Sequence, residues 1–416
     1  MNPLLPRQFF TPDVEAHVMP DGRLYLYGSN DLSGNMDYCS QEYRVYSTDD
    51  PALERWVDHG VSFRNAAATP GLPWNPAATL LAPDAAQRDG KYYLYVCAND
   101  QSEAVAQGDS PCGPFAGARR IEGADGIDPA VFVDDDGQAY YLWGQFSLKG
   151  ARLNADMTSL DPASITDGLL TEQEHGFHEG SSMRKINGRY YIVFTDISRG
   201  RATCLSYAVA DQPLGPYRKG GVIIDNVYCD PETWNNHGSI ECFQGRWFVF
   251  YHRSSQNSRF SRRVCVEPIA INPDGSIDEV VMTCNGASAP IDAFAPIDAS
   301  IACRLKGNAR ALPTPGRPGE ETLCHCGGGN WTEDWAEYRW LDFGKGASAC
   351  ALALRGHGTV SLMAPGRGRI GRERFSSPEG FATVTLKLHQ PLQGIGAVWV
   401  LFDGQGIECA TLRFVR

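Results

Sequence analysis

Five times along the chain, a polar residue and a glycine precede a run of aromatic and aliphatic residues. Such a pair before such a run is typical of a tight turn that leads into a buried β-strand. The copies start 68, 47, 51 and 57 residues apart, and a repeat of about this length built from strands and turns predicts the blades of a five-bladed β-propeller. The copies are DGRLYLYGS from Asp21, DGKYYLYVC from Asp89, DGQAYYLWG from Asp136, NGRYYIVFT from Asn187 and QGRWFVFYH from Gln244.

A carboxylate stands eight residues before the turn in three of these copies. The three residues are Asp13, Asp128 and Glu179. In the other two copies, Asp84 lies five residues and His237 seven residues before the turn. The innermost strands of a propeller line its central channel, so residues at equivalent points of these strands converge on one cavity. One acidic residue near a turn is common, but three at the same offset indicate a shared site.

The strand pattern stops near Asn285, where the chain becomes rich in Ala, Pro and Gly. Short alternating runs then resume, among them AEYRWLDFG, SACALALRG, TVSLMAPG, AVWVLFDG and ECATLRFVR. Short strands at regular spacing are typical of a β-sandwich. We therefore predict an all-β protein, with a five-bladed propeller over residues 1–288 and a jelly-roll β-sandwich over residues 289–416.

Composition narrows the classes of partner. The net charge of −12 and the isoelectric point near 5.2 argue against binding to nucleic acid or to an anionic membrane. No stretch is apolar enough for a membrane span. The first ten residues lack the pattern of a signal peptide, and the 13 cysteines have no paired spacing, so we expect reduced thiols in a cytoplasmic protein.

The three aligned carboxylates fit the chemistry of glycoside hydrolysis. One carboxyl must be protonated to donate to the leaving oxygen, and a second must be ionised to activate water. A third nearby carboxylate raises the pKa of the acid by repulsion between like charges. The sequence has neither a phosphate-binding glycine-rich loop after a strand nor a G-x-S-x-G motif, so no organic cofactor and no serine nucleophile is expected.

Three motifs in order resemble those of glycoside hydrolase family 43. They are DVEAHV at Asp13, IDPAVF around Asp128 and HEGSSM around Glu179. The resemblance covers residues 5–284 and implies a five-bladed propeller that hydrolyses its substrate with inversion. It assigns Asp13 as the general base, Asp128 as the residue that orients the acid and raises its pKa, and Glu179 as the general acid. Val14 departs from the proline that usually follows the base.

The resemblance also implies binding residues. Asp84 ends a motif in which Leu81 replaces the usual Trp, so Trp74 is expected to supply an aromatic wall of the sugar pocket. Asp84 is expected beside the substrate, with the capping of a turn as the alternative. Arg262 matches an arginine that contacts sugar hydroxyls, and Arg263 is the alternative.

His237 matches a histidine near the channel axis that faces a Ca²⁺ ion or a water cluster in many members of the family. A buried, hydrogen-bonded histidine is the alternative interpretation. The C-terminal runs DWAEYRWLDFG and WVLFDGQG weakly resemble carbohydrate-binding module family 6, although the tryptophans of these runs suit a sandwich core equally.

The expected activity is that of an inverting exo-glycosidase that releases terminal α-L-arabinofuranosyl or β-D-xylosyl units from plant-type oligosaccharides. A β-D-galactofuranosidase of the same fold is one alternative, and a non-catalytic sugar-binding propeller is another. A fructan-type hydrolase would need an arginine before Asp128, where Ile127 stands. These patterns leave the linkage and the oligomeric state open.

Overall fold

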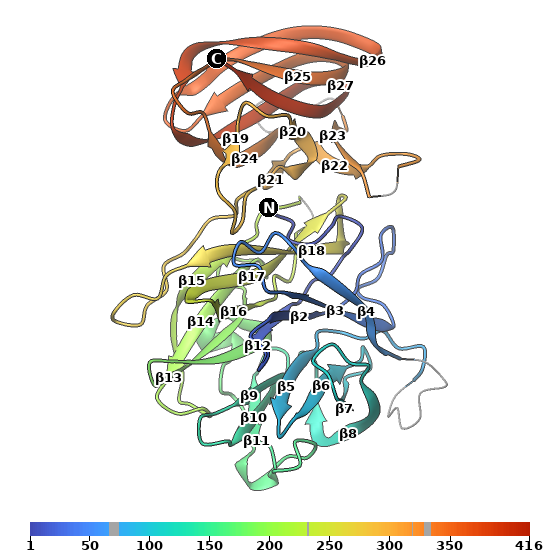
Figure 1. Ribbon diagram of the computed structural model, residues 1–416, viewed down its shortest axis with the longest axis vertical. Coiled ribbons are helices and arrows are strands. Elements are labelled where there is room, and N and C mark those ends of the chain that lie inside the picture. Colours follow the sequence, from blue (N-terminus) through green and yellow to red (C-terminus); the bar gives the residue numbers. More distant parts are fainter. Residues whose placement is uncertain (66–74, 231–232, 318, 328–333) are drawn as a thin grey trace.

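Five antiparallel sheets form a ring, and a second strand-rich domain lies at one side of it (Figure 1). The computed structural model describes residues 1–65, 75–230, 233–317, 319–327 and 334–416. The first strands of neighbouring sheets contact one another in the cyclic order β1, β5, β9, β12, β16, so they surround a central channel. The predicted all-β fold, with a five-bladed propeller followed by a β-sandwich, is confirmed.

The blades have three or four strands each. Blade 1 contains β1 (Glu15–Val18), β2 (Leu24–Gly28), β3 (Glu42–Thr48) and β4 (Val57–Arg64). Blade 2 contains β5 (Asp84–Arg88), β6 (Lys91–Cys97), β7 (Ser102–Gly108) and β8 (Ala116–Asp125). Blade 3 contains β9 (Ala130–Val133), β10 (Ala139–Trp143) and β11 (Lys149–Arg152).

The last two blades complete the ring. Blade 4 contains β12 (Phe177–Ile186), β13 (Arg189–Asp196), β14 (Cys204–Ala210) and β15 (Arg218–Asp225). Blade 5 contains β16 (Ser239–Phe243), β17 (Arg246–Ser255) and β18 (Ser258–Ile269). The described helices are the short α1 (Glu172–His175) and the 3₁₀ turns η1 (Pro162–Ser164) and η2 (Ala299–Ile301). Among the described residues, no helix is long and apolar enough to cross a membrane.

Turn chemistry explains where the first strands of the blades reverse. Asn187 and Gly188 have φ values of 50° and 80°, which is the two-residue hairpin turn that matches the twist of its strands. Asp89 and Gly90 have the same form, with φ values of 51° and 77°. The predicted polar-glycine pairs therefore act as hairpin turns between the first and second strands of these blades.

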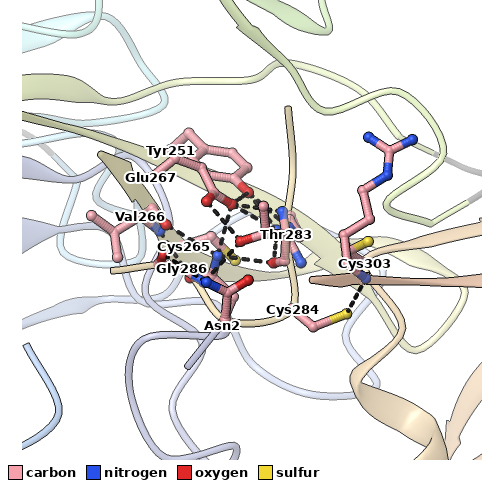
Figure 2. A network of polar contacts seen from close by, with 12 residues as sticks. Asn2, Tyr251, Cys265, Val266, Glu267, Thr283, Cys284, Gly286 and Cys303 are labelled. Carbon is pink, nitrogen blue, oxygen red and sulfur yellow. Dashed lines mark hydrogen bonds and ion pairs between the residues drawn. The ribbon is translucent and has the colours of Figure 1, made fainter. Parts of the chain in front are cut away.

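The N-terminal segment closes the ring against blade 5. The backbone N–H of Leu4 donates to the carbonyl of Val264 on β18 at 2.9 Å. The side chain of Asn2 bonds both backbone groups of Val266, at 3.1 and 2.9 Å. It also donates to Glu267 at 3.0 Å and to the carbonyl of Thr283 at 3.1 Å, within the polar network of Figure 2.

The C-terminal domain is a β-sandwich with three long, bent strands. It contains β19 (Ile291–Asp292), β20 (Ile297–Asp298), β21 (Arg304–Lys306), β22 (Ala309–Pro313), β23 (Glu321–His325), β24 (Trp335–Asp342), β25 (Ala347–Ala364), β26 (Gly368–Leu392) and β27 (Ile395–Val415). The predicted domain boundary at residue 288 falls between the end of β18 and the start of β19.

The long strands differ from the separate short runs predicted for this domain. SACALALRG and TVSLMAPG are one continuous strand, β25. Gly356 and Gly358 within it have φ values of 99° and 154°, and the register shifts at the first of them. These glycines therefore bend the strand by a bulge and do not end it.

The two domains share a buried boundary. One apolar cluster joins Val249 and Tyr251 of blade 5 to Tyr338 and Leu341 of β24. Arg263, 3% exposed, donates to both carboxylate oxygens of Glu321 on β23, at 3.1 and 2.8 Å. The sandwich is thus fixed to the outer part of blade 5 by packing and by a buried ion pair.

We expect Asn2→Ala to destabilise the fold. Asn2 is 1% exposed, and its loss leaves buried partners in blade 5 without hydrogen bonds, which costs about 1–3 kcal/mol of unfolding free energy. Urea denaturation followed by tryptophan fluorescence measures the change. The exposed Asn99→Ala is the matched control, and an Asn2 variant as stable as that control would contradict this account of ring closure.

Candidate active site

The site lies where the innermost strands begin. Asp13 and Asp128 stand two residues before β1 and β9, and His237 stands two residues before β16. Glu179 lies at an irregular position near the start of β12. Asp13 and Asp128 have φ values of 56° and 59°, in the left-handed region that residues with a Cβ seldom adopt. The equal offsets in the sequence therefore correspond to one end of the channel.

These residues line one pocket with a volume of about 250 Å³. All three predicted carboxylates and His237 belong to its wall, so the structure brings them together. The remaining described residues of the wall are Tyr38, Cys39, Leu81, Ala82, Ile127, Gln145, His178, Trp234, Asn235 and Arg262.

Asp13 is held by a buried guanidinium. Nη1 of Arg262 donates to Oδ1 of Asp13 at 2.8 Å, while Nε and Nη2 donate to the two oxygens of Asp31 at 2.9 and 3.0 Å. Nδ1 of His252 lies 3.2 Å from the same Asp13 oxygen. Burial by itself raises the pKa of Asp13, but the Arg262 charge and His252 outweigh it and lower the pKa well below its usual range. Asp13 is therefore ionised, as a general base must be.

Glu179 and Asp128 have the opposite electrostatic environment. Burial raises the pKa of Glu179, and Asp13 raises it further, although His178 and a 2.8 Å hydrogen bond from Gln145 oppose the shift. Burial and the charge of Glu179 raise the pKa of Asp128 well above its ordinary value. The pair therefore retains a proton where solvent-exposed carboxyls have lost theirs, which is the condition for a general acid.

A glycine allows the close approach of His237 to this pair. Gly180 has a φ of 57°, and a Cβ there would lie 2.8 Å from Cγ of His237. Gly180 N–H donates to Oδ2 of Asp128 at 3.2 Å. Nδ1 of His237 lies 3.7 Å from that oxygen and 4.0 Å from Oδ1 of Asp13. Burial lowers the pKa of His237 to about 4, so its imidazole is neutral.

Aromatic rings stand at the pocket. The ring of His178 packs edge-on against Phe146 and Trp234, with centroids 5.2 and 6.1 Å apart. Trp234 is 36% exposed, and an exposed indole offers an apolar face to a sugar. The predicted aromatic wall, Trp74, lies outside the described residues.

The two candidate arginines separate in the structure. Arg262 lines the pocket, and its hydrogen bonds to Asp13 and Asp31 make it a residue that positions the Asp13 carboxylate. Arg263 bonds Glu321 at the domain boundary. The alternative assignment of Arg263 to the sugar site is wrong, because neighbouring residues of a strand point to opposite faces.

Asp84 is absent from the pocket wall, which differs from its expected place beside the substrate. Its Oδ1 lies 2.6 Å from Nε2 of His17, and its Oδ2 accepts from the N–H of Val131 at 2.7 Å. The physical reason is its shorter offset, five residues before the turn in place of eight. Three residues of strand move it about 10 Å along the channel, and Leu81 and Ala82 occupy the pocket wall of blade 2.

Several residues that contribute to the site were not predicted, among them Gln145, Asp31, Trp234 and His252. Gln145, Asp31 and Trp234 carry no pattern that distinguishes them from other polar or aromatic residues near turns. His252 does carry a signal, because it is a titratable residue inside the apolar run of β17 and is fully buried.

Comparison with known proteins identifies the fold family. The model of glycosyl hydrolases family 43 matches residues 1–277. The chain belongs to this family. A xylosidase/arabinosidase of Thermoclostridium stercorarium is 32% identical over 348 residues, covering 73% of this chain and 72% of that protein. Xylosidase/arabinosidase 43A of Humicola insolens is 36% identical over 336 residues, covering 67% of this chain and 98% of that protein.

Solved structures of the family agree with the propeller. A β-xylosidase/α-arabinofuranosidase from a compost metagenome, solved with xylotriose in a calcium-free form, has a TM-score of 0.57 and 30% identity, covering 67% of this chain and 97% of that chain. An arabinoxylan arabinofuranohydrolase of Bacillus subtilis shares the fold over 100% of this chain and 97% of its own, with a TM-score of 0.56 and 22% identity. The family match ends at residue 277, so the resemblance of the C-terminal domain to carbohydrate-binding module family 6 stays a prediction.

The hydrogen bond from Gln145 provides a test of the general acid in this glycosidase. Its amide stabilises the ionised form of Glu179, so Gln145→Ala should raise the pKa of Glu179. The alkaline limb of the kcat/KM profile on an aryl glycoside should then move to higher pH, since the acid keeps its proton longer. The exposed Gln212→Ala should leave the profile unchanged. A Gln145 variant whose alkaline limb stays in place, or moves down, would exclude Glu179 as the titrating acid.

Proposed function

We propose that the protein is an inverting exo-glycosidase that releases terminal β-D-xylosyl or α-L-arabinofuranosyl units from plant-type oligosaccharides. One observation carries this proposal. A single pocket holds Asp13, a carboxylate that Arg262 keeps ionised. The same pocket holds Glu179 and Asp128, a carboxyl pair that burial keeps protonated. Inverting hydrolysis needs these two protonation states on opposite sides of one glycosidic bond.

The reaction follows from this division. Glu179 gives its proton to the glycosidic oxygen while the bond from that oxygen to the anomeric carbon breaks. Asp13 accepts a proton from a water molecule as the water oxygen forms its bond to the anomeric carbon. Asp128 acts through Glu179, because two carboxyls so close together cannot both ionise at low cost. Arg262 positions Asp13, and its charge keeps the base ionised before each turnover.

The size of the pocket favours cleavage at the chain end. Its volume of about 250 Å³ lies below the range of ~300–1,000 Å³ typical of sites for drug-sized ligands. A pocket of this size holds one sugar unit, so the rest of the oligosaccharide extends outward. Trp234 and Phe146, at 36% and 51% exposure, are placed to stack on that outer part.

The relatives support the choice of sugar. The relatives from T. stercorarium and H. insolens are both named for xylose and arabinose units. A β-D-galactofuranosidase of Aspergillus niger is 26% identical over 316 residues, so galactofuranosides are the second candidate class. Hydrolysis of 4-nitrophenyl β-D-xyloside, α-L-arabinofuranoside and β-D-galactofuranoside tests the proposal. Turnover of either pentoside supports it, and turnover of the galactofuranoside alone would replace it.

We also propose that His237 binds a hydrated Ca²⁺ ion at the propeller axis. Its imidazole is neutral, has no hydrogen bond to a described residue, and lies near the carboxyl groups of Asp13 and Asp128. Ca²⁺ prefers oxygen ligands, so His237 would supply one ring nitrogen and water would supply most of the oxygen ligands. A bound ion would add positive charge beside Asp13 and Asp128.

The dependence of the rate on the leaving group distinguishes the role of Glu179 from that of Asp13. Glu179→Gln should lower kcat/KM on a 4-nitrophenyl glycoside by about 10²–10⁴-fold. It should have a much smaller effect on a 2,4-dinitrophenyl glycoside, whose leaving group departs without a proton. Asp13→Asn should lower both rates alike, because water activation is needed in either case.

The exposed carboxylates Glu174 and Asp136 offer matched controls. Glu174→Gln and Asp136→Asn remove the same charge outside the pocket and should keep the wild-type rates. Equal losses of the Glu179 variant on both substrates would contradict its role as the acid, and a leaving-group effect in the Asp13 variant would reverse the two assignments.

A further inference from the structure

The propeller channel has a second opening, at the end away from the active site. This opening has a volume of about 400 Å³ and is lined by later residues of the innermost strands, among them His17, Gln87, Val133, Arg184 and Glu241. It shares no lining residue with the active-site pocket. A small ion can therefore reach His17 from solvent without passing the catalytic carboxylates.

Three potential metal ligands meet at the inner end of this opening. Glu15 and His17 are alternate residues of β1, so both lie on the channel face of the strand. Asp84 begins β5, the innermost strand of the next blade. One ligand atom from each of the three residues lies within 4.8 Å of the other two. The group offers one imidazole nitrogen and two carboxylates.

One oxygen of this group has no partner. Oε2 of Glu15 accepts from Ser182 at 2.9 Å and lies 3.3 Å from Nη2 of Arg184. Oε1 of Glu15 is buried and has no hydrogen bond to any described residue, although the side chain is only 2% exposed. A buried carboxylate oxygen without a partner is costly and needs an explanation. A bound cation would provide one.

Neighbouring backbone groups orient Asp84. The backbone N–H groups of Ala85 and Val131 donate to Asp84 at 2.6 and 2.7 Å. Ordered hydrogen bonds of this kind hold the ligands of many protein metal sites. Arg184 is the guanidinium beside the cluster, and it also pairs with Glu241 at 3.1 Å. Arg184 therefore pairs with two carboxylates, and Asp84 adds a third acidic group within its electrostatic reach, which favours an added cation.

We propose that Glu15, His17 and Asp84 bind one divalent transition-metal ion, with Zn²⁺ as the expected species. One nitrogen and two carboxylate oxygens, with water in the fourth position, suit the tetrahedral preference of Zn²⁺. Ca²⁺ takes six to eight oxygen ligands, whereas this buried cluster offers two carboxylates and an imidazole nitrogen close together, which favours the smaller coordination number of Zn²⁺. The ion takes the place of the hydrogen bond between His17 and Asp84, whose atoms are 2.6 Å apart and must separate by roughly 0.7 Å for tetrahedral coordination.

The site is structural in this proposal. It joins β1 to β5 inside the channel, and Glu15 lies two residues after the catalytic Asp13 on the same segment. The proposal is independent of the sugar that the enzyme cleaves, and it concerns a position separate from His237.

Zn²⁺ binding to the full-length, chelator-treated protein tests the proposal. Competition against a chromophoric chelator should show one tight Zn²⁺ equivalent in the wild type. Glu15→Gln and His17→Gln should each weaken it by more than about 100-fold, since loss of a direct ligand exceeds the 10–100-fold cost of losing an outer contact. The His237→Ala variant should still bind one Zn²⁺ equivalent tightly, which distinguishes this site from the active-site pocket. Co²⁺ in place of Zn²⁺ should give the visible absorption of a tetrahedral ion in the wild type.

Glu241→Gln is the matched control. It removes another carboxylate that contacts Arg184 but leaves the three ligands in place, so its Zn²⁺ affinity should stay within a few-fold of the wild type. Thermal unfolding of the metal-free variants verifies that each is folded. The proposal is overturned if the wild type binds no stoichiometric Zn²⁺, if Glu241→Gln weakens binding as much as Glu15→Gln, or if binding is lost only in His237→Ala.

Discussion

The buried ion pair between Arg262 and Asp13 is the interaction on which the rest of the site depends. It joins β18, the last strand of the propeller, to the first catalytic residue, across 249 positions of sequence. Asp31 of blade 1 holds the other face of the same guanidinium. Removing one partner of such a buried pair leaves an uncompensated charge and typically costs 3–5 kcal/mol. The contact that closes the ring is therefore also the contact that keeps Asp13 ionised.

The same ion pair explains how one small pocket keeps carboxyl groups in two protonation states. All three acids are buried, and burial alone favours the neutral form of each. Only Asp13 has a guanidinium within hydrogen-bonding distance, so only its pKa falls. Glu179 receives a single amide hydrogen bond, which is too weak to offset burial. The position of one arginine thus gives Asp13 and Glu179 opposite pKa shifts, as the proposed base and acid require.

The sequence predicted the parts of this arrangement that depend on local periodicity. The polar-glycine turns and the runs after them are the hairpins of the blades, and the common offset of Asp13, Asp128 and Glu179 brought them to one pocket. Asp84 shows the limit of this reasoning. Its offset is three residues shorter, and each residue of strand advances the chain by about 3.3 Å, so it lies deeper in the channel with His17.

Long-range contacts could not be predicted from local pattern. Asp31 lies outside the repeated motif and His252 ends its fifth copy, but their contacts with Arg262 and Asp13 arise only when the ring closes. In the sandwich, SACALALRG and TVSLMAPG are predicted as separate strands, whereas pairing with β26 and β27 continues through Gly356 and Gly358 between them. The conformation of a glycine is decided by its neighbours in space.

The configuration of the first sugar released tests the central claim most directly, because it reports whether Asp13 activates water or attacks the sugar itself. Proton NMR of early turnover on an aryl β-D-xyloside, or on the pentoside that is cleaved, distinguishes the two anomers before they equilibrate. The account predicts the inverted product, α-D-xylose from the β-xyloside, since the ionised Asp13 accepts a proton from water. Release of the retained β-anomer would show a covalent intermediate and would contradict the role of Asp13 as a base.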